Sequence, residues 1–258
     1  MDMEVFCIME DKKFEGSYAR YYDLFNKNKD YKKEIDFLEQ VFKKFNLKNK
    51  KVLDLGCGTG LHEKELSDRI YEMTGLDLSP DMIEIAKEKT PNVKFVVGDM
   101  SNFELNEKFD SIICMFSAIG YLTENKQIEN FFKCVKRHLN PNGLLIIDCW
   151  NGLGVMHELP TSREKIVEVK GLKIVRRSFP DLDVKNHINN VKFEVEIFKN
   201  DNLIKKYEEI HKVRFFFPKE LEKYMNDEEF ELIHLCPSYE FGEELTEKHW
   251  NMILVGRI

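Results

Sequence analysis

The spacing of apolar and polar residues differs between the first and the later part of the chain. In residues 31–45, apolar side chains recur every three or four positions among lysines and acids, which predicts an amphipathic helix. Short apolar runs then alternate with helical segments as far as residue 149. The strands expected from this alternation are 51–55, 72–76, 93–97, 111–115 and 144–149, and the helices are 61–67, 81–89 and 127–139. Strands separated by helices predict a parallel sheet covered on both faces.

A period of two begins after residue 151. Apolar and polar residues alternate over 191–197, and a turn at 200–202 leads into a second strand expected over 203–216. The later elements expected are a helix over 218–225 and strands over 230–235 and 250–255. Strands that follow strands without helices between them predict an antiparallel insertion.

The combined prediction is an α/β fold with a doubly wound, mostly parallel Rossmann-like sheet and an antiparallel β insertion before the last helix. We divide the chain into lid helices and core over residues 1–153, the insertion over 154–217, and a return to the core over 218–258. This order places the insertion after the strands that carry the glycine-rich and acidic motifs.

The composition and charge of the chain limit the kinds of partner that it can bind. With 43% hydrophobic and 33% charged residues the chain can form a packed core, and its net charge of −7 provides no basic field for nucleic acid. No apolar run is long enough to span a bilayer, and the first residues lack a basic leader followed by an apolar run. The six cysteines and seven histidines show no metal-ligand spacing. We expect a cytoplasmic protein with a small-molecule substrate, without a metal, nucleic acid or membrane partner.

A glycine-rich turn follows the first core strand. Gly56, Gly58 and Gly60 allow a sharp bend and a close approach of backbone to a ligand at the carboxyl edge of the sheet. The spacing differs from the G-x-G-x-x-G of dinucleotide sites, and Glu63 and Glu65 near the helix start would repel a pyrophosphate. The turn therefore suits a ligand that carries a positive sulfonium and an amino group.

Two acids follow at the ends of the next strands. Asp77 is placed to accept both hydroxyls of a ribose, and Asp99 to accept from an adenine amine, with Met100 and Leu78 packed against the ring. Each carboxylate alone also fits a loop acid or a helix cap. Three such features in order, each at the carboxyl end of a strand, favour a cofactor site.

These motifs resemble those of the class I S-adenosylmethionine methyltransferases, which correspond here to residues 54–60, Asp77, Asp99 with Met100, and 109–121. The resemblance covers nearly the whole chain and implies S-adenosyl-L-methionine as the cofactor. More narrowly, residues 18–25, 29–31 and 115–122, and a strand that ends at Trp150, resemble the amino-sugar N-methyltransferases. Those enzymes methylate the amine of nucleotide-linked deoxyamino sugars and carry a β insertion before the last helix.

The resemblance also implies roles for single residues. Tyr31 and Met115 are expected to contact the cofactor, and Tyr121 and Trp150 the substrate. The amino-sugar enzymes have a histidine at the position of His211, which implies that it receives or relays the proton lost by the acceptor amine.

The first helical segment offers further candidates. Tyr18 and Tyr22 fall on one helical face and can close over the methionine end of the cofactor, with Lys27 or Lys29 near its carboxylate. The alternative is that both tyrosines pack the helix onto the sheet. Tyr18 is the second candidate for the proton transfer.

Three charged residues are candidates on the substrate side. Glu209 shares a strand face with His211, and Arg176 and Arg177 form a pair suited to a substrate phosphate or are ordinary surface arginines. The loop 115–118 lacks the Asn/Asp-Pro-Pro-aromatic sequence that holds a flat nucleobase amine, so base methylation is disfavoured.

Methyl transfer to the amine of a small molecule, in particular a nucleotide-linked deoxyamino sugar, is the function favoured by these patterns. Methyl transfer to another small amine, to a hydroxyl or to a carboxylate is an alternative, although a hydroxyl acceptor would need a stronger base or a metal. A non-catalytic module that binds the cofactor and regulates a partner is a further alternative, and a homodimer also stays open.

Overall fold

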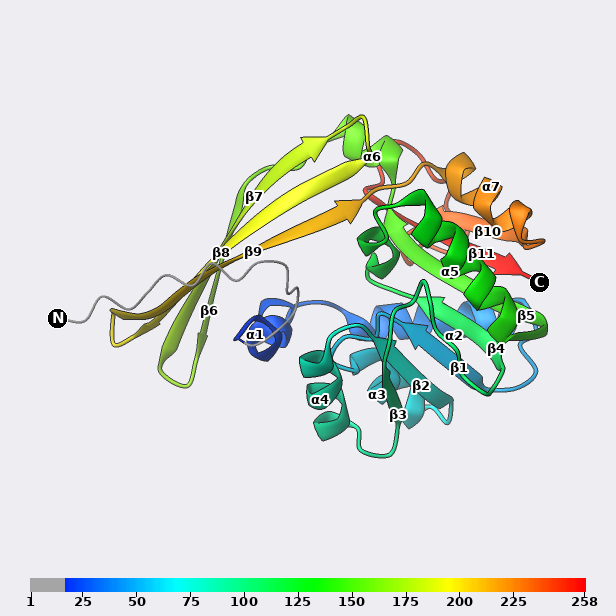
Figure 1. Cartoon of the computed structure of the whole chain (residues 1–258), viewed down its shortest axis with the longest axis horizontal. Coiled ribbons are helices and arrows are strands. Elements are labelled where there is room, and N and C mark those ends of the chain that lie inside the picture. The colour runs from blue at the N-terminus through cyan, green and yellow to red at the C-terminus, as the bar shows by residue number, and fades with distance from the viewer. Residues whose placement is uncertain (1–16) are drawn as a thin grey trace.

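The larger of two sheets forms the core of the protein. A computed structural model describes the backbone of residues 17–258 and the side chains of residues 19–258. The strands of the larger sheet are β1 (Lys51–Leu55), β2 (Glu72–Asp77), β3 (Lys94–Val97), β4 (Phe109–Cys114), β5 (Leu139–Trp150), β10 (Glu231–Pro237) and β11 (Asn251–Arg257). Their order is β10-β11-β5-β4-β1-β2-β3, and β10 and β11 pair antiparallel while the neighbours from β5 to β3 pair parallel. The predicted doubly wound, mostly parallel sheet is confirmed (Figure 1).

Helices cover both faces of this sheet. The helices of the described residues are α1 (Ser17–Phe25), α2 (Tyr31–Lys44), α3 (Leu61–Asp68), α4 (Pro80–Lys89), the 3-10 helix η1 (Ala118–Tyr121), α5 (Asn125–His138), α6 (Gly152–His157) and α7 (Pro218–Asp227), and α1 packs against the smaller sheet instead. Because successive strand residues point to opposite faces, Ile112 packs with the α5 and α7 side while Ile113 packs with α2 and α3. The two apolar clusters hold the sheet rigid, and its carboxyl edge is left for the loops.

Capping side chains start two of these helices. The side chain of Asp30 accepts from the Lys33 amide at 2.9 Å before α2. Ser79 accepts from the Met82 amide at 3.2 Å, with Pro80 in the first position of α4. The Ser79 cap fixes where the chain leaves the end of β2 and turns into α4, and the Asp30 cap fixes the start of α2 after the turn that follows α1.

The smaller sheet is antiparallel, in the order β6-β7-β8-β9. Its strands are β6 (Arg163–Val169), β7 (Leu172–Asp183), β8 (Ile188–Lys199) and β9 (Asn202–Arg214), all inside the segment predicted as an insertion. Its long strands extend away from the larger sheet and pass over α1 (Figure 1). Phe25 of α1 is fully buried against Val167, Ile174, Val195 and Ile197 of this sheet. We call the side that faces α1 the inner face and the opposite side the outer face.

Two details differ from the expectations. Residues 140–143, an Asn-Pro-Asn-Gly run typical of a turn, lie at the start of β5, although Asn142 has a left-handed φ of 63°. The β insertion was expected over residues 154–217, but no ranges were predicted within it for the strands β6 and β7. Their sequences mix charged and apolar residues, so neither reads as a separate apolar run.

Candidate active site

The turn between β1 and α3 carries the predicted glycines. Gly56, Gly58 and Gly60 have φ values of 81°, 55° and 76°, in the left-handed region. A Cβ atom at Gly56 would also lie 2.5 Å from the Cβ of Ala118 in η1. Gly56 is therefore required both by its backbone angle and by the close approach of η1.

Asp77 ends β2 beside this turn. Its Oδ2 accepts from the Gly58 amide and its Oδ1 from the Ser79 amide, both at 2.8 Å. Burial raises the pKa of the Asp77 carboxyl, although the backbone hydrogen bonds oppose the increase. The next side chain, Leu78, is 70% exposed. An acceptor held at the sheet edge thus lies beside an unburied apolar side chain.

The predicted adenine contacts follow β3. Asp99 Oδ1 accepts from the amide and the hydroxyl of Ser101 at 2.7 and 2.8 Å, and Met100 is half-buried against the core. Since β2 and β3 are paired with Asp77 opposite Val97, these residues lie along one edge of the sheet next to Asp77. The structure therefore brings the predicted ribose and adenine residues together, while their binding roles stay predictions.

A small cavity of about 30 Å³ lies on the other side of the turn. Its walls are Tyr22, Lys29, Tyr31, Gly56, Cys57, Gly58, Thr59, Leu61, His62, Met115 and Phe116. Five of the predicted cofactor residues are among them. Tyr22 also packs in the cluster around Phe25, so α1 packs against the insertion sheet as well as facing the cavity.

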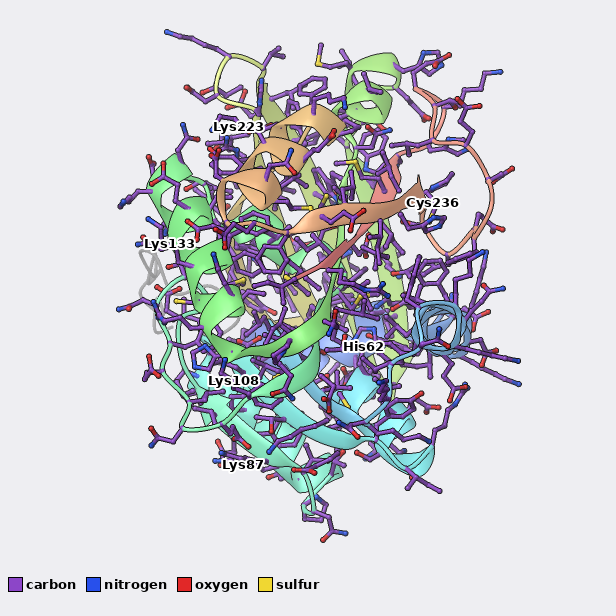
Figure 2. All side chains as sticks on the ribbon, turned by 90° about the vertical axis from the view of Figure 1, so that its right-hand side faces the viewer. His62, Lys87, Lys108, Lys133, Lys223 and Cys236 are labelled. Atoms are coloured by element: carbon purple, nitrogen blue, oxygen red, sulfur yellow. The ribbon has the colours of Figure 1, made fainter. Side chains whose placement is uncertain are left out.

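Opposite charges line the base of this cavity. Lys29 Nζ lies 2.8 Å from Glu34 Oε2, 4.1 Å from the Tyr31 ring centre and 3.9 Å from that of Phe116. Glu34 Oε2 also lies 2.7 Å from His62 Nε2, and His62, which is labelled in Figure 2, is buried. Burial lowers the pKa of Lys29, against the effect of its carboxylate neighbours. An ammonium and a carboxylate side by side fit a zwitterionic ligand.

Two carboxyl groups are buried beneath the turn. The four oxygens of Asp54 and Glu63 lie out of solvent, and none accepts a hydrogen bond from a donor group in residues 19–258. The two groups contact each other, and burial raises both pKa values, that of Asp54 to about 6. The nearest charges on them come from His62, Lys29 and Asp77. One proton shared between the two carboxyls satisfies both.

This pair gives a pH-dependent stability. Because both folded pKa values are raised, the folded protein keeps a proton that the unfolded chain releases at lower pH, so stability is lost as the pH rises toward the folded values. In Glu63→Gln a neutral amide replaces the protonated carboxyl, so the folded variant does not have to bind a proton at this position. It should leave the free energy of unfolding nearly unchanged at pH 4 and raise it above pH 6, by up to about 1.4 kcal/mol per pH unit. Urea unfolding between pH 4 and 8 measures this difference.

The matched control is Glu84→Gln, at an exposed position of α4. It should follow the wild type at every pH. If the difference between Glu63→Gln and the wild type is independent of pH, the shared proton does not exist.

A chain of hydrogen-bonding side chains lies on the inner face of the insertion sheet. The Tyr121 hydroxyl is 2.9 Å from His211 Nδ1, and His211 Nε2 is 2.9 Å from Glu209 Oε2. His211 is 1% exposed. Gly120 permits the approach of η1 to β9, because a Cβ there would lie 2.9 Å from the Arg214 carbonyl oxygen. Three predicted residues from distant segments thus meet, five residues beyond Phe116 in the cavity wall.

The two adjacent arginines are separated by the sheet. Arg176 lies on the inner face, with its guanidinium 4.7 Å from the Phe25 ring centre and 4.9 Å from that of Phe193. Arg177 lies on the outer face, 2.8 Å from Glu164 and 2.7 Å from Glu196. Neighbours on a strand point to opposite faces. The two therefore cannot bind one diphosphate together, which corrects the pairing expected from the sequence.

The remaining predicted residues are placed as follows. Trp150 ends β5, half-buried, with its ring 5.9 Å from that of Trp250 and edge-on to it. Tyr18 belongs to α1, but its side chain lies outside the described residues. Over residues 17–258, no helix has the length and apolar character needed to cross a bilayer, and no three side chains gather as ligands for a metal ion.

Sequence reasoning missed Asp148 and Tyr239. The Tyr239 hydroxyl donates to Asp148 Oδ2 at 3.1 Å at the end of β5, and burial raises the pKa of Asp148 to about 6. A buried acid in the apolar run 144–149 was the available signal. Asp23 was missed too: it accepts from the Thr59 hydroxyl at 2.6 Å and pairs with Lys89, so it ties α1 to the glycine turn and to α4.

Comparison with known proteins shows similarity to methyltransferases. Residues 52–143 match the family model described as "Methyltransferase domain". The whole fold is similar to an S-adenosylmethionine-dependent methyltransferase from Clostridium acetobutylicum, with a TM-score of 0.77 at 22% identity over 93% of this chain and 97% of that one. Residues 52–143 are thus similar to a methyltransferase domain, and the whole chain has the fold of that S-adenosylmethionine-dependent methyltransferase.

More specific relatives act on amino sugars. The chain is 34% identical over 139 residues to dTDP-3-amino-3,6-dideoxy-alpha-D-glucopyranose N,N-dimethyltransferase from Streptomyces fradiae, a match that covers 53% of this chain and 54% of that protein. It is 31% identical over 139 residues to dTDP-3-amino-3,4,6-trideoxy-alpha-D-glucopyranose N,N-dimethyltransferase from Streptomyces venezuelae, covering 53% and 59%. The chain therefore matches little more than half the length of these relatives.

A sugar N-methyltransferase from Streptoalloteichus has a similar fold over the whole chain. Its TM-score is 0.82 at 21% identity, with coverage of 100% of this chain and 99% of that one. The narrower resemblance noted in the sequence is thus matched by relatives of that kind.

Proposed function

We propose that the protein is an S-adenosylmethionine-dependent N-methyltransferase. The cofactor fits the residues present: Asp77 offers a carboxylate for the ribose, Leu78 and Met100 offer apolar contacts for the adenine, and Lys29 and Glu34 offer opposite charges for the amino acid end. Bound there, S-adenosylmethionine supplies a methyl group on a positively charged sulfur, which an uncharged amine can attack.

The acceptor amine has to lose a proton before it reacts, and the inner face offers a route. With Nε2–H of His211 donating to Glu209, Nδ1 accepts from the Tyr121 hydroxyl. As that hydroxyl proton moves to Nδ1, the phenolic oxygen can take the proton of the acceptor ammonium. Glu209 stabilises the resulting imidazolium. In this proposal Tyr121 and His211 move the proton and Glu209 orients the ring.

The proposed acceptor is the amine of a nucleotide-linked deoxyamino sugar. The observation that carries this choice is the Tyr121, His211 and Glu209 chain on an insertion sheet, in a protein similar to two dimethyltransferases whose names specify dTDP-amino sugars. Transfer to a hydroxyl is less favoured, because a hydroxyl needs a stronger base than an amine does.

The test is a methylation assay with purified protein. S-adenosylmethionine and a panel of dTDP-3-amino and dTDP-4-amino deoxysugars should give products heavier by one or two methyl groups in mass spectrometry. Free amino acids, simple amines and sugars with a hydroxyl in place of the amine serve as comparison acceptors. Methylation of a free amine or a hydroxyl, with no product from any nucleotide amino sugar, would sink the acceptor proposal and leave only the methyltransferase class.

A further inference from the structure

Two consecutive residues between β4 and η1 have left-handed backbone angles. Phe116 and Ser117 have φ values of 53° and 59°. This conformation is uncommon for a residue with a Cβ atom, and it is strained for a side chain as large as phenylalanine. In the described part of the chain, the other such pair without a glycine is Asn200 and Asp201, in the exposed turn between β8 and β9, where these residue types tolerate it. The Phe116–Ser117 turn therefore needs neighbours that hold it in place.

A buried carboxylate of the neighbouring strand holds this turn. Asp148, near the end of β5, is 1% exposed. It accepts hydrogen bonds from the Phe116 amide and from the Tyr239 hydroxyl, the latter at 3.1 Å from Oδ2. Since β4 and β5 pair with Cys114 opposite Ile147, Asp148 lies just beyond the last residue of β4. The carboxylate thus ties the strained turn to the loop that follows β10.

The turn belongs to both halves of the proposed active site. On one side, Met115 and Phe116 line the cavity at the methionine end of the cofactor site. On the other side, Ser117 directly precedes η1, and η1 carries the Tyr121 hydroxyl to 2.9 Å from His211 Nδ1. A displacement of the turn therefore moves the cavity wall and the Tyr121 hydroxyl together.

Asp110, at the opposite end of β4, is a carboxylate with a contrasting place in the fold. It is 8% exposed and accepts from the Lys51 amide at 3.2 Å. The side-chain amides of Asn49 and Asn140 also donate to it, at 3.2 and 3.0 Å. These hydrogen bonds lie at the start of β1, β4 and β5, at the edge of the sheet away from the glycine turn. Asp110 is therefore a matched control for Asp148.

We propose that Asp148 is a positioning residue for methyl transfer, which holds the Phe116–Ser117 turn and thereby places the cavity wall and Tyr121. The inference rests on the proposed function and extends it to a side chain behind the cavity wall. A carboxylate suits this role because it accepts from an amide and a hydroxyl at once, through charge-assisted hydrogen bonds. An asparagine has the same shape but only one acceptor oxygen, so it cannot hold both donors equally well.

Calorimetric titration of the full chain with S-adenosylmethionine tests the proposal without an acceptor. Asp148→Asn should weaken the affinity by roughly tenfold, as for loss of a charged hydrogen bond. The control Asp110→Asn should stay within about twofold of the wild type, even where it lowers the thermal midpoint measured by circular dichroism. In a Ser117→Gly background, Asp148→Asn should cost less than about threefold, because glycine adopts the left-handed angle without strain.

The glycine background separates positioning from a general loss of stability, since a purely structural role of Asp148 would cost the same in both backgrounds. Tyr239→Phe is a milder variant that keeps the carboxylate. It should weaken the affinity by about threefold, and again by less in the Ser117→Gly background.

The outcomes distinguish this inference from the proposed function. If the wild type binds S-adenosylmethionine but Asp148→Asn and Tyr239→Phe bind it equally well, the positioning role is wrong while the proposed function stands. The same holds if their losses are equal in both backgrounds. If the wild type does not bind S-adenosylmethionine, both the proposed function and the positioning role fail.

Discussion

Replacing Asp77 by alanine is expected to weaken S-adenosylmethionine binding by roughly 2 to 3 kcal/mol, or about 30- to 150-fold in dissociation constant. The carboxylate stands at the carboxyl end of β2, beside the glycine turn, where one group can accept both ribose hydroxyls. It also accepts from the Gly58 and Ser79 amides, so its loss removes a tether of the turn itself. Titration calorimetry with S-adenosylmethionine measures the effect.

Two comparison variants show whether the loss of S-adenosylmethionine affinity comes from the Asp77 side chain itself. Asp99→Ala should act in the same direction but more weakly, because Met100 and backbone groups still contact the adenine. Asp68→Ala, an exposed acid at the end of α3, is the control and should bind as the wild type does. A folded Asp77→Ala protein with unchanged affinity would remove Asp77 from the cofactor site.

The alternation of strands and helices made the core predictable. Six of the seven strands of the larger sheet lie within two residues of the ranges expected, because each is a short apolar run between helical or turn segments, and β5 begins five residues earlier than expected. The positions of Asp77 and Asp99 followed from the same rule, since parallel strands bring their carboxyl ends to one edge. Local pattern and tertiary position agree wherever a strand is buried on both faces.

The insertion was less predictable because its strands are exposed on one side. Its inner face still followed a period of two, which correctly grouped Glu209 with His211 on β9. The same period separates Arg176 from Arg177, since β7 sends alternate residues to opposite faces. The pairing of the two arginines failed because β7 was not recognised as a strand from its mixed sequence.

The network at the base of the cavity could not be read from the sequence. Glu34 comes from α2, His62 from α3 and Lys29 from the turn before α2, and only the packing of α2 on α3 brings them together. Each looks like an ordinary charged residue of an amphipathic helix or a loop. Their burial in the folded protein distinguishes them, and burial of a charge is a property of the assembled fold.

Removing the insertion sheet is expected to abolish methylation while leaving S-adenosylmethionine binding within a few-fold of the wild type. The chain leaves and re-enters the larger sheet at neighbouring points, because Phe216 pairs with Asn151 and its amide donates to the Trp150 carbonyl at 3.1 Å. A flexible glycine-serine linker in place of residues 160–212 can therefore close the gap. The variant keeps Asp77, Asp99 and the glycine turn but loses His211, Glu209 and Arg176.

Three measurements decide this prediction: circular dichroism for the fold, calorimetry for S-adenosylmethionine, and the mass assay for turnover. The modest loss of cofactor affinity is expected because Tyr22 and Phe25 of α1 lose the sheet they pack against. A control that shortens only the β8–β9 turn near Asn200–Asn202 removes chain length but no inner-face residue near His211, and it should keep turnover. If the linker variant folds and still methylates the same acceptor at a comparable rate, the proton route through Tyr121, His211 and Glu209 is wrong, because the reaction then needs only the larger sheet and its loops.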